Sequence, residues 1–348
     1  MIRPRRGLAA SRRGFLQATA ALTLGGCWSA GAREATVYAA LDSEFSQPIF
    51  EEYQRQSGAT ILAKFDTEAA KTVGLANAIL AETSRPRCDV FWNNEILNTL
   101  RLEAAGALEP YSSQFANRFP VEFQSPTAHW CGFAARARVL LVNAQRVAES
   151  DHPRYVTDLL DPRWQGQVAI AKPLFGTTAT HAACLFAALG AKAAENFFLA
   201  AQRNGVQIHP GNKQVAQAVS SGAAAWGLTD TDDAAVEIDK GQPVRLVFPD
   251  QGADALGTLL IPNTLALIRG APHLDEGKKL IDYLLAGPVE DRLAQGPSAQ
   301  FPLSTAATGR SRLAPAAPLK SMKIDFSAAA AQWDAAQKFL RDTFTAPT

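Results

Sequence analysis

The stretch that decides the fold is "ATVYAALDSEFSQPIFEEYQRQSG", residues 35–58. It begins with a short β-rich apolar run, which is typical of a buried strand. Phe45, Ile49 and Tyr53 then recur at helical spacing, and the final glycine is a common helix stop. The stretch therefore predicts a strand, a loop and a helix in succession, which is the repeating unit of α/β folds.

The same unit recurs along the chain. In the first third, strand-like and helical runs alternate at 59–65, 68–82, 88–92 and 96–108. A second series has strand-like runs at 138–143, 206–209, 224–228 and 243–249, and helical runs at 181–205 and 213–222. Short apolar strands that alternate with amphipathic helices predict an α/β fold with a parallel sheet covered on both faces.

The order of these elements predicts two lobes joined by a hinge. We expect residues 36–130 and 255–305 to form lobe 1 and residues 131–254 to form lobe 2. The β-run at 257–268 is long enough to cross between the lobes. A helical segment at 306–348 is expected to follow.

Residues 1–26 predict a signal peptide rather than part of the fold, because five arginines and no acid accompany an apolar stretch too short and Gly-rich to span a bilayer. Within this segment "SRRGFLQ" resembles a twin-arginine export signal. "LGGC" resembles a lipobox, which would make Cys27 the lipidated first residue and anchor the protein to the membrane. The alternative is an ordinary signal peptide cleaved slightly later. Both predict export to the periplasm or cell envelope.

Composition limits the class of protein. The chain has 348 residues, of which 47% are apolar and 19% charged, enough for one large or two medium globular domains. Removing the five arginines of the signal peptide lowers the formal charge from +1 to −4, and a mildly acidic body argues against a nucleic-acid partner. Cys88, Cys131 and Cys184 lack metal-binding spacing, so core positions are favoured over a zinc site, although one disulfide is permitted outside the cytoplasm.

Candidate ligand-binding residues lie where predicted strands meet helices, because ligands of open α/β sheets sit beyond the carboxyl ends of the strands. In "FDTEAAKT", Thr67 is a candidate, with a helix cap as the alternative role. "DVFWNNEIL" offers an aromatic wall, two amides and a carboxylate in one turn, although Asn-Asn is also ordinary turn chemistry. These candidates are Trp92, Asn93, Asn94 and Glu95.

Two further junctions favour an anion. The segment "FGTTATH" places three hydroxyls and an imidazole at the start of a long apolar helix, whose free N–H groups attract negative charge. One threonine would suffice as a cap. The candidates there are Thr177, Thr178, Thr180 and His181. Asn212 and Lys213 begin the next helix, where a surface lysine is the alternative role.

The acidic run "LTDTDDA" follows the strand-like run at 224–228, so it belongs to the same edge. Its candidate residues are Thr229, Asp230, Asp232 and Asp233. Three closely packed carboxylates do not all ionise without a cation, bound water or capping amides. The run therefore predicts a ligand-binding segment, with a solvated helix cap as the alternative.

Enzyme motifs are absent from the sequence. It contains no GxSxG, HExxH, P-loop or GxGxxG. Glu95, His181 and the aspartates could form an acid/base set, but no nucleophile with a matched base is suggested by spacing. We therefore expect a binding protein without a cofactor, and an exported enzyme on the same scaffold is the alternative.

Several blocks of sequence, in order, resemble the extracellular solute-binding proteins of ABC importers, and more narrowly their ferric-iron-type cluster. These blocks include "VYAALDSEFSQ", "DVFWNNE", "FGTTATH", "AWGLTDTDDA" and "GTLLIPNTLALIRGAPHLDEGKKLIDYLL". The resemblance implies a two-lobed, type II periplasmic-binding fold that closes on a solute and delivers it to a membrane permease. Asp42, in the first block, joins the candidate binding residues. A monomer is expected.

The resemblance also implies a cargo. Ferric binders of this cluster hold iron largely with tyrosinate oxygens, including a Tyr-Tyr pair after the strand that matches "AWGL". Here those positions are Asp232 and Asp233, and an acidic ligand of some relatives would fall near Asn94 or Glu95. Fe(III) on Glu95, Asp232 and Asp233, with a synergistic anion at the threonines, is the first hypothesis. A phosphonate, phosphorylated or zwitterionic organic anion, with its amine on the aspartates, is the second.

Overall fold

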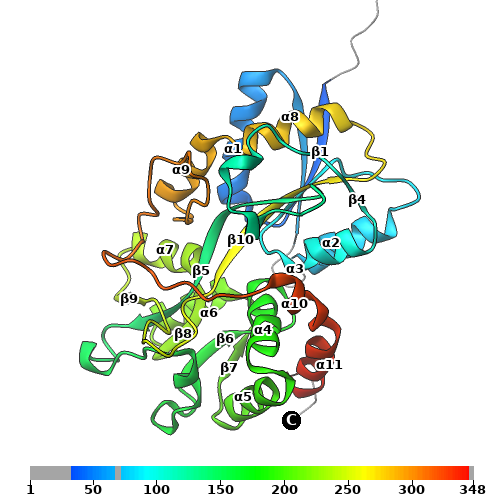
Figure 1. Cartoon of the computed structure of the whole chain (residues 1–348). Helices are drawn as coiled ribbons and strands as arrows, with labels where there is room; N and C mark the ends of the chain where they lie inside the picture. The colour runs from blue at the N-terminus through cyan, green and yellow to red at the C-terminus, as the bar shows by residue number, and fades with distance from the viewer. Residues whose placement is uncertain (1–32, 67–71, 345–348) are drawn as a thin grey trace, which may run out of the picture. The chain divides into compact units, whose positions relative to one another are not determined.

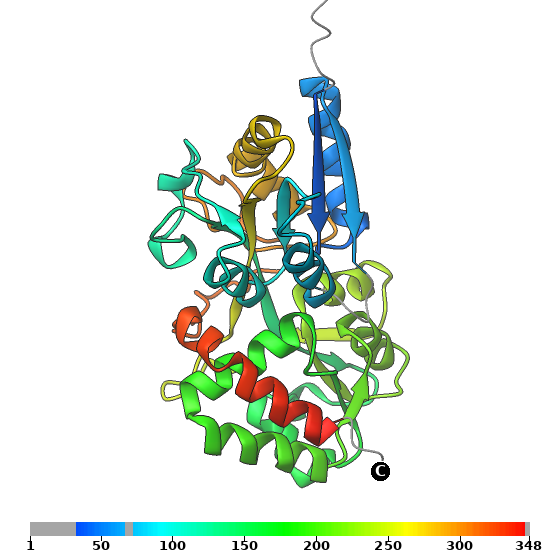
Figure 2. The same ribbon diagram turned by 90° about the vertical axis from the view of Figure 1, so that its right-hand side faces the viewer.

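The computed structural model describes residues 33–66 and 72–344. The predicted signal peptide, Cys27 and Thr67 therefore lie outside the described residues. From Arg33 onward the chain forms one compact unit, which contains both lobes described below. Figures 1 and 2 show this unit from two sides.

The first lobe is built mainly from the N-terminal third of the chain. Its elements there are β1 (Glu34–Ala39), α1 (Ser43–Ser57), β2 (Thr60–Phe65), α2 (Val73–Ala81), β3 (Val90–Asn93), α3 (Leu97–Ala104) and β4 (Leu108–Glu109). Later in the chain, β10 (Leu260–Ile268), α8 (Leu274–Leu284) and α9 (Gly287–Gln295) return to this lobe. Helices α1, α8 and α9 cover one face of its sheet, and α2 and α3 cover the other (Figure 1).

The second lobe follows the long strand β5 (Cys131–Asn143). Its elements are β6 (Val168–Ala171), α4 (Gly176–Leu189), α5 (Ala191–Arg203), β7 (Gln207–His209), α6 (Asn212–Ser220), β8 (Trp226–Asp230), α7 (Thr231–Asp239) and β9 (Val244–Val247). Helices α4 and α5 pack on one face of this part of the sheet, and α6 packs on the other. The chain ends with α10 (Phe326–Ala331) and α11 (Trp333–Phe344).

All strands join one mixed sheet of order β2-β1-β3-β10-β5-β8-β6-β7, with β4 beside β10 and β9 beside β5. The outer strands are parallel, as predicted: β1 with β2 and β3, and β6 with β7 and β8. The prediction of a wholly parallel sheet is wrong at the centre, where β10 and β5 run antiparallel to their neighbours. They do so because β5 carries the chain out to lobe 2 and β10 carries it back.

Strand β5 is the element shared by the two lobes. It begins seven residues before the run predicted at 138–143, and all 13 of its residues are buried. Its first half pairs with β10 and its second half with β8 and β9. A β-bulge interrupts the β10 pairing at Pro262, and Ala134 on the facing stretch has a positive φ of 41°. The strand is therefore irregular where it leaves lobe 1.

Two other predicted elements differ in their bounds. The helix predicted at 181–205 is two helices, because Gly190 adopts a φ of 81° between α4 and α5. Helix α4 also begins earlier, at Gly176. Strand β8 extends to Asp230, so this aspartate ends the strand rather than lying in the following loop.

The C-terminal helices pack on both lobes. Phe326 and Trp333 share a hydrophobic core with Leu97 of α3 and Ala183 of α4. Figure 2 shows α11 lying across the helices of lobe 2. The thiols of Cys88, Cys131 and Cys184 are free and buried, which agrees with their predicted role as core residues.

Candidate functional site

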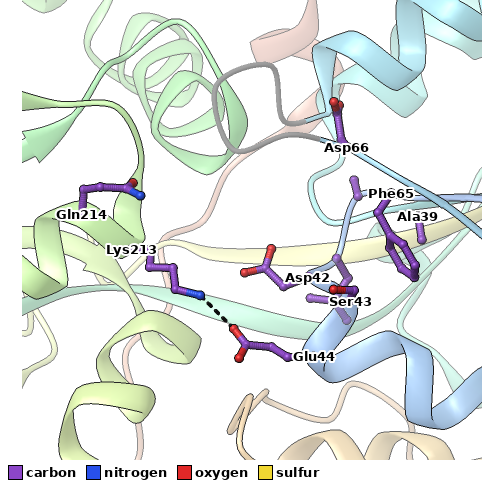
Figure 3. A pocket seen from close by; sticks show the side chains of 10 residues that line it. Ala39, Asp42, Ser43, Glu44, Phe65, Asp66, Lys213 and Gln214 are labelled. Atoms are coloured by element: carbon purple, nitrogen blue, oxygen red, sulfur yellow. Dashed lines mark hydrogen bonds and ion pairs between the residues drawn. The ribbon is translucent and has the colours of Figure 1, made fainter.

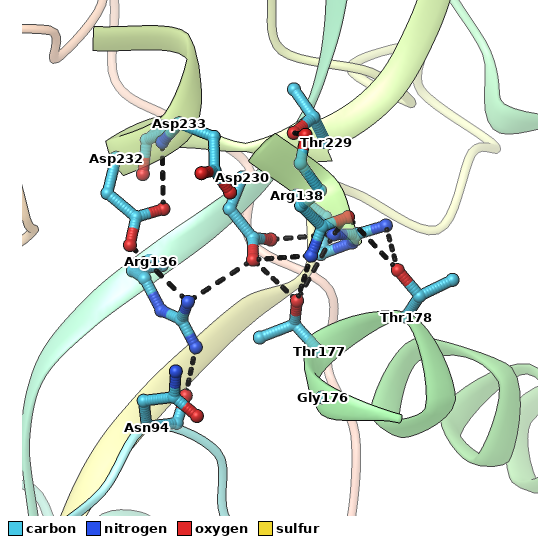
Figure 4. A network of polar contacts seen from close by, with 12 residues as sticks. Asn94, Arg136, Arg138, Gly176, Thr177, Thr178, Thr229, Asp230, Asp232 and Asp233 are labelled. Atoms are coloured by element: carbon cyan, nitrogen blue, oxygen red, sulfur yellow. Dashed lines mark hydrogen bonds and ion pairs between the residues drawn. The ribbon is translucent and has the colours of Figure 1, made fainter. Parts of the chain in front are cut away.

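Two arginines of β5 form the centre of the polar network at the junction of the lobes. Arg136 and Arg138 are two residues apart, so they project from the same face of the strand. Arg138 Nη1 lies 2.7 Å from Asp230 Oδ1, and Arg136 Nη1 lies 3.3 Å from Asp230 Oδ2. The last residue of β8 is thus held between two guanidinium groups (Figure 4).

Sequence reasoning missed both arginines. The signal was present in "FAARARVLLVN", because an arginine inside an apolar strand is costly unless it is paired with a carboxylate. The prediction therefore named no counter-ions for the acidic run. The structure supplies those counter-ions from a strand that is nearly 100 residues away in sequence.

The acidic run itself occupies the end of β8 and the first turn of α7. Asp232 Oδ2 lies 3.4 Å from Arg136 Nη1, and the Asp233 N–H donates to Asp232 Oδ1. One carboxylate oxygen from each of Asp230, Asp232 and Asp233 lies within 4.8 Å of the others. Among the described residues this is the one group of three or more metal-ligating side chains.

The pKa values of the paired groups follow from this arrangement. Burial alone would raise the pKa of Asp230, but Arg138 and Arg136 outweigh it and hold the pKa below its ordinary value. Burial alone would lower the pKa of Arg136, but the neighbouring carboxylates raise it above its ordinary value. Each charged group of this network is therefore kept ionised by its oppositely charged neighbours.

The predicted anion-binding helix starts lie against the same network. Thr177 Oγ1 donates to Asp230 Oδ2 at 2.5 Å, and Arg138 Nη2 donates to Thr178 Oγ1 at 3.2 Å. Asn212, the first residue of α6, accepts from Arg138 Nη1 at 3.0 Å. The structure therefore brings together residues that four different elements supply.

A close approach of α6 to β8 makes the contact with Asn212 possible. A Cβ atom added at Gly227 would lie 2.6 Å from Val215 and 2.8 Å from the carbonyl oxygen of Ala169. Only glycine fits between the helix and the strands there. Thr229, two residues on, donates its hydroxyl to the carbonyl oxygen of Asn212, so its role in this structure is to fix the start of α6.

The structure places Glu95 apart from the three aspartates. It is fully buried, and its carboxylate accepts from the backbone N–H groups of Leu97 and Asn98 at the start of α3. Thr180 of lobe 2 also donates to it, at 2.9 Å, so this pair is a contact between the lobes. Asn93 donates to Glu95 as well, whereas the backbone carbonyl oxygen of Asn94 accepts from Arg136 Nη2.

Two other candidates lie in the interior. Trp92, expected to form an aromatic wall of the site, is fully buried in the core of lobe 1, where it packs on Phe50 and Phe133. Its strand is covered on both faces, so its side chain cannot reach a cleft. His181 is also buried, and burial together with the charge of Arg138 lowers its pKa to about 3. It is a neutral imidazole at physiological pH.

A cavity of about 380 Å³ opens beside the network, between the lobes. Lobe 1 contributes the end of β1 and the start of α1, together with Phe65 and Asp66. Lobe 2 contributes Lys213 and Gln214 of α6. Lys213 Nζ lies 3.1 Å from Glu44 Oε1 across the cavity (Figure 3).

Asp42 connects this cavity to the arginine network. It lines the cavity from lobe 1, and its charge, like that of Asp233, raises the pKa of both Arg136 and Lys213. In Arg136 these two effects add to the larger ones of Asp232 and Asp230, and in Lys213 to that of Glu44. The cavity and the aspartate cluster therefore share one electrostatic environment.

The formal charges around this cleft do not cancel. Among residues 33–66 and 72–344, three cations face six carboxylates, which leaves an excess of three negative charges. The cations are Arg136, Arg138 and Lys213, and the carboxylates are Asp42, Glu44, Asp66, Asp230, Asp232 and Asp233.

A two-lobed α/β unit with a charged cleft between its lobes is the architecture of a solute-binding protein. Over residues 99–329 the chain matches the model of the bacterial extracellular solute-binding proteins, and it belongs to that family. The expectations of a solute-binding protein of the ABC-importer class, and not an enzyme, are thereby confirmed. No helix within 33–66 and 72–344 combines the length and hydropathy needed to cross a bilayer.

Individual relatives agree with this family. Iron uptake protein A1 of Synechocystis is 26% identical over 253 residues, which cover 68% of this chain and 69% of the relative. Iron-bound HitA from Pseudomonas aeruginosa superposes with a TM-score of 0.80 at 22% identity, covering 89% of this chain and 99% of HitA. AfuA from Actinobacillus pleuropneumoniae, with bound fructose-6-phosphate, superposes with a TM-score of 0.79 at 20% identity, covering 90% and 99%. The predicted two-lobed, type II periplasmic-binding fold is thus confirmed.

Proposed function

We propose that this solute-binding protein captures ferric iron, together with an oxyanion, in the cleft between its lobes and delivers it to an ABC-importer permease. The observation that carries the proposal is the excess of three negative charges, all on oxygen donors, around the cavity and the aspartate cluster. Fe(III) is a hard trivalent cation that favours oxygen ligands. The iron-binding relatives described above support the same cargo.

The proposed ligands come from both lobes. Asp232 and Asp233 are presented by the first turn of α7. Asp42, directly before α1 in lobe 1, lines the cavity and is near enough to Arg136 to raise its pKa. Closure of the lobes on the ion would complete the coordination shell. Glu95 is less suited to be a ligand, because backbone N–H groups and Thr180 already use its carboxylate oxygens.

The oxyanion would bind at the start of α4. The helix N-terminus provides partial positive charge there, and Arg138 contacts both Thr177 and Thr178. The two hydroxyls would have to exchange their bonds to Asp230 and Asn212 for bonds to the anion. The anion would fill coordination positions of the iron that the protein leaves open. It would also balance part of the ion's charge within a partly buried cleft.

Metal analysis of the protein and a titration with Fe(III)–citrate test the proposal. We expect bound iron, and a rise in melting temperature on adding Fe(III)–citrate to the metal-free protein. The double substitution Asp232→Asn with Asp233→Asn should weaken Fe(III) binding by at least about 100-fold, because it removes two charged oxygen ligands. Asp239→Asn, at the far end of α7, is the matched control and should bind as the unaltered protein does. If the purified protein contains no iron and Fe(III)–citrate does not raise its melting temperature, iron is ruled out as the cargo.

A second candidate is a small phosphonate, phosphorylated or zwitterionic organic anion. The observation that favours it is the cavity of about 380 Å³, which is within the size range of small-molecule pockets and larger than one ion needs. Lys213 and the start of α6 would meet the anionic group, and the aspartates a cationic one. A thermal shift with phosphate, phosphonates or aminophosphonates but none with Fe(III)–citrate would select this candidate.

Export and anchoring are also proposed. The twin-arginine-like segment and the lipobox-like "LGGC" support export followed by lipidation of Cys27, and AfuA, which this chain resembles in fold, is a periplasmic binding protein. Mass spectrometry of the exported protein should detect a diacylglyceryl-modified N-terminus at this residue. An unlipidated N-terminus further along the chain would indicate an ordinary signal peptide.

A further inference from the structure

The guanidinium of Arg136 occupies the position that a cation would take among the carboxylates. Its Nη1 lies 3.3 Å from Asp230 Oδ2 and 3.4 Å from Asp232 Oδ2, and its Nη2 donates to the carbonyl oxygen of Asn94 in lobe 1 (Figure 4). The side chain is 4% exposed, so little water screens these contacts. Arg136 is thus an internal counter-ion that already bridges the two lobes.

Arg138 has a different position. It is fully buried, and its hydrogen bonds run to Asp230, Thr177, Thr178 and Asn212, which all lie in lobe 2. It contacts neither Asp232 nor lobe 1 through any of these bonds. Of the two arginines, Arg136 is therefore the one that a cation entering the cluster would meet.

Unsatisfied polar atoms next to Arg136 point to a ligand in the same place. Asn94 is 2% exposed, and its Oδ1 atom is buried without a hydrogen-bond partner among the described residues. The Nε atoms of Arg136 and Arg138 are likewise buried, and neither has a partner in the described part of the chain. Buried polar atoms in native proteins are nearly always satisfied, so a further group is expected to enter here when the site is filled.

We propose that Arg136 sets the cation selectivity of this cleft, because an entering metal ion must replace its guanidinium at Asp232. The inference rests on the proposed function. Breaking one buried arginine–carboxylate pair costs the same whichever ion enters. Divalent ions, which bind clusters of carboxylates more weakly, then fail to occupy the site, whereas a trivalent ion retains enough attraction to displace the guanidinium.

The direct test is Arg136→Gln in the otherwise complete protein. Manganese(II) chloride and Fe(III)–citrate are titrated separately into metal-free protein by calorimetry. We expect the unaltered protein to bind Fe(III) and to show no measurable affinity for Mn(II). Arg136→Gln should gain Mn(II) affinity by about 100-fold or more, which corresponds to relief from breaking a buried ion pair.

Two further variants separate selectivity from structure. Arg136→Gln with Asp232→Asn removes one charge of each sign and should lose the gained Mn(II) affinity, because the unmasked carboxylate is gone. Arg136→Lys retains the charge without the forked geometry, so its Mn(II) affinity should be intermediate. If circular dichroism shows that Arg136→Gln does not fold, Arg136→Lys is used for the test instead.

The outcomes distinguish this inference from the proposed function. Binding of Fe(III) by the unaltered protein, with no gain of Mn(II) affinity in either single variant, overturns the role of Arg136 and leaves the cargo in place. A gain of Mn(II) affinity without any Fe(III) binding by the unaltered protein upholds the role of Arg136 and rejects iron as the cargo.

Discussion

The two walls of the cleft carry charge in different ways. On the lobe 2 side Asp230 is fully buried and is held by Arg138, Arg136 and Thr177. On the lobe 1 side Asp42 and Asp66 are partly exposed and Glu44 is exposed. A buried charge must be compensated by the protein, whereas an exposed one is compensated largely by water. Lobe 2 is therefore preorganised, and the charges of lobe 1 can adapt to the solute.

The largest effect is expected from Arg138→Met. This substitution leaves Asp230 with one guanidinium instead of two and removes the donor to Thr178 and Asn212. The free energy of unfolding should therefore fall by about 3–5 kcal/mol. Urea denaturation measures this loss. Lys338→Met, which breaks an exposed pair with Asp342 on α11, is the matched control and should cost less than about 1 kcal/mol. Equal losses in the two variants would contradict the contrast between buried and exposed charge.

A smaller effect is expected from acid. Because the pKa of His181 is lowered to about 3, its imidazole stays neutral in the native protein at pH values where the unfolded chain binds a proton, which it does near pH 6.5. The stability from this residue is complete above pH 6.5 and is lost as pH falls toward 3. Between pH 7 and pH 5 the loss is about 2 kcal/mol. His181→Phe should flatten the slope of unfolding free energy against pH in that window.

The control for this pH dependence is His152→Gln, which changes a histidine in a surface turn of lobe 2 outside the arginine network. It should keep the slope of the unaltered protein. If His181→Phe keeps the slope as well, then the imidazole of His181 takes up protons in the native state, and the lobe 2 side is better hydrated than its packing implies.

The smallest effect is expected from Lys213→Met on the exposed side of the cleft. Its contact with Glu44 joins two side chains that are 38% and 48% exposed, so its loss should change stability by less than about 1 kcal/mol. Its effect on the solute should depend on salt, since the charge borders the cavity. Fe(III) should bind the variant slightly more tightly at low ionic strength, because a positive charge has been removed. A large loss of stability in the variant would show instead that the Lys213–Glu44 pair is shielded from water.

Much of the fold can be predicted from the sequence because most of its strands and helices are encoded locally. The apolar spacing of Phe45, Ile49 and Tyr53 predicts α1, and all three are buried. The antiparallel centre was not predictable in this way, since the direction of β5 depends on long-range pairing with β8 and β10. The break at Gly190 was missed because the apolar pattern continues across it.

The candidate site was predicted in part for the same reason. Thr177, Asn212 and Asp230 each stand at the end of an element, where composition signals a special role, and the structure brings all three together. Arg136 and Arg138 lie inside a strand, where the expectation of an apolar core concealed them. The actual position of Glu95, at the start of α3, depends on hydrogen bonds to a helix whose exact beginning the sequence does not specify.

The path of the chain also limits how the cleft can open. The lobes are joined by β5, by the connection into β10, and by the C-terminal helices, which pack on α3 of one lobe and α4 of the other. Two adjacent strands alone would permit twisting as well as bending. The C-terminal helices add a third connection beside these strands. Rotation of one lobe relative to the other is therefore confined close to a single axis. Because Arg136 lies on β5, one of the strands that join the lobes, it would move less on opening than Asp42, which lines the cavity from lobe 1.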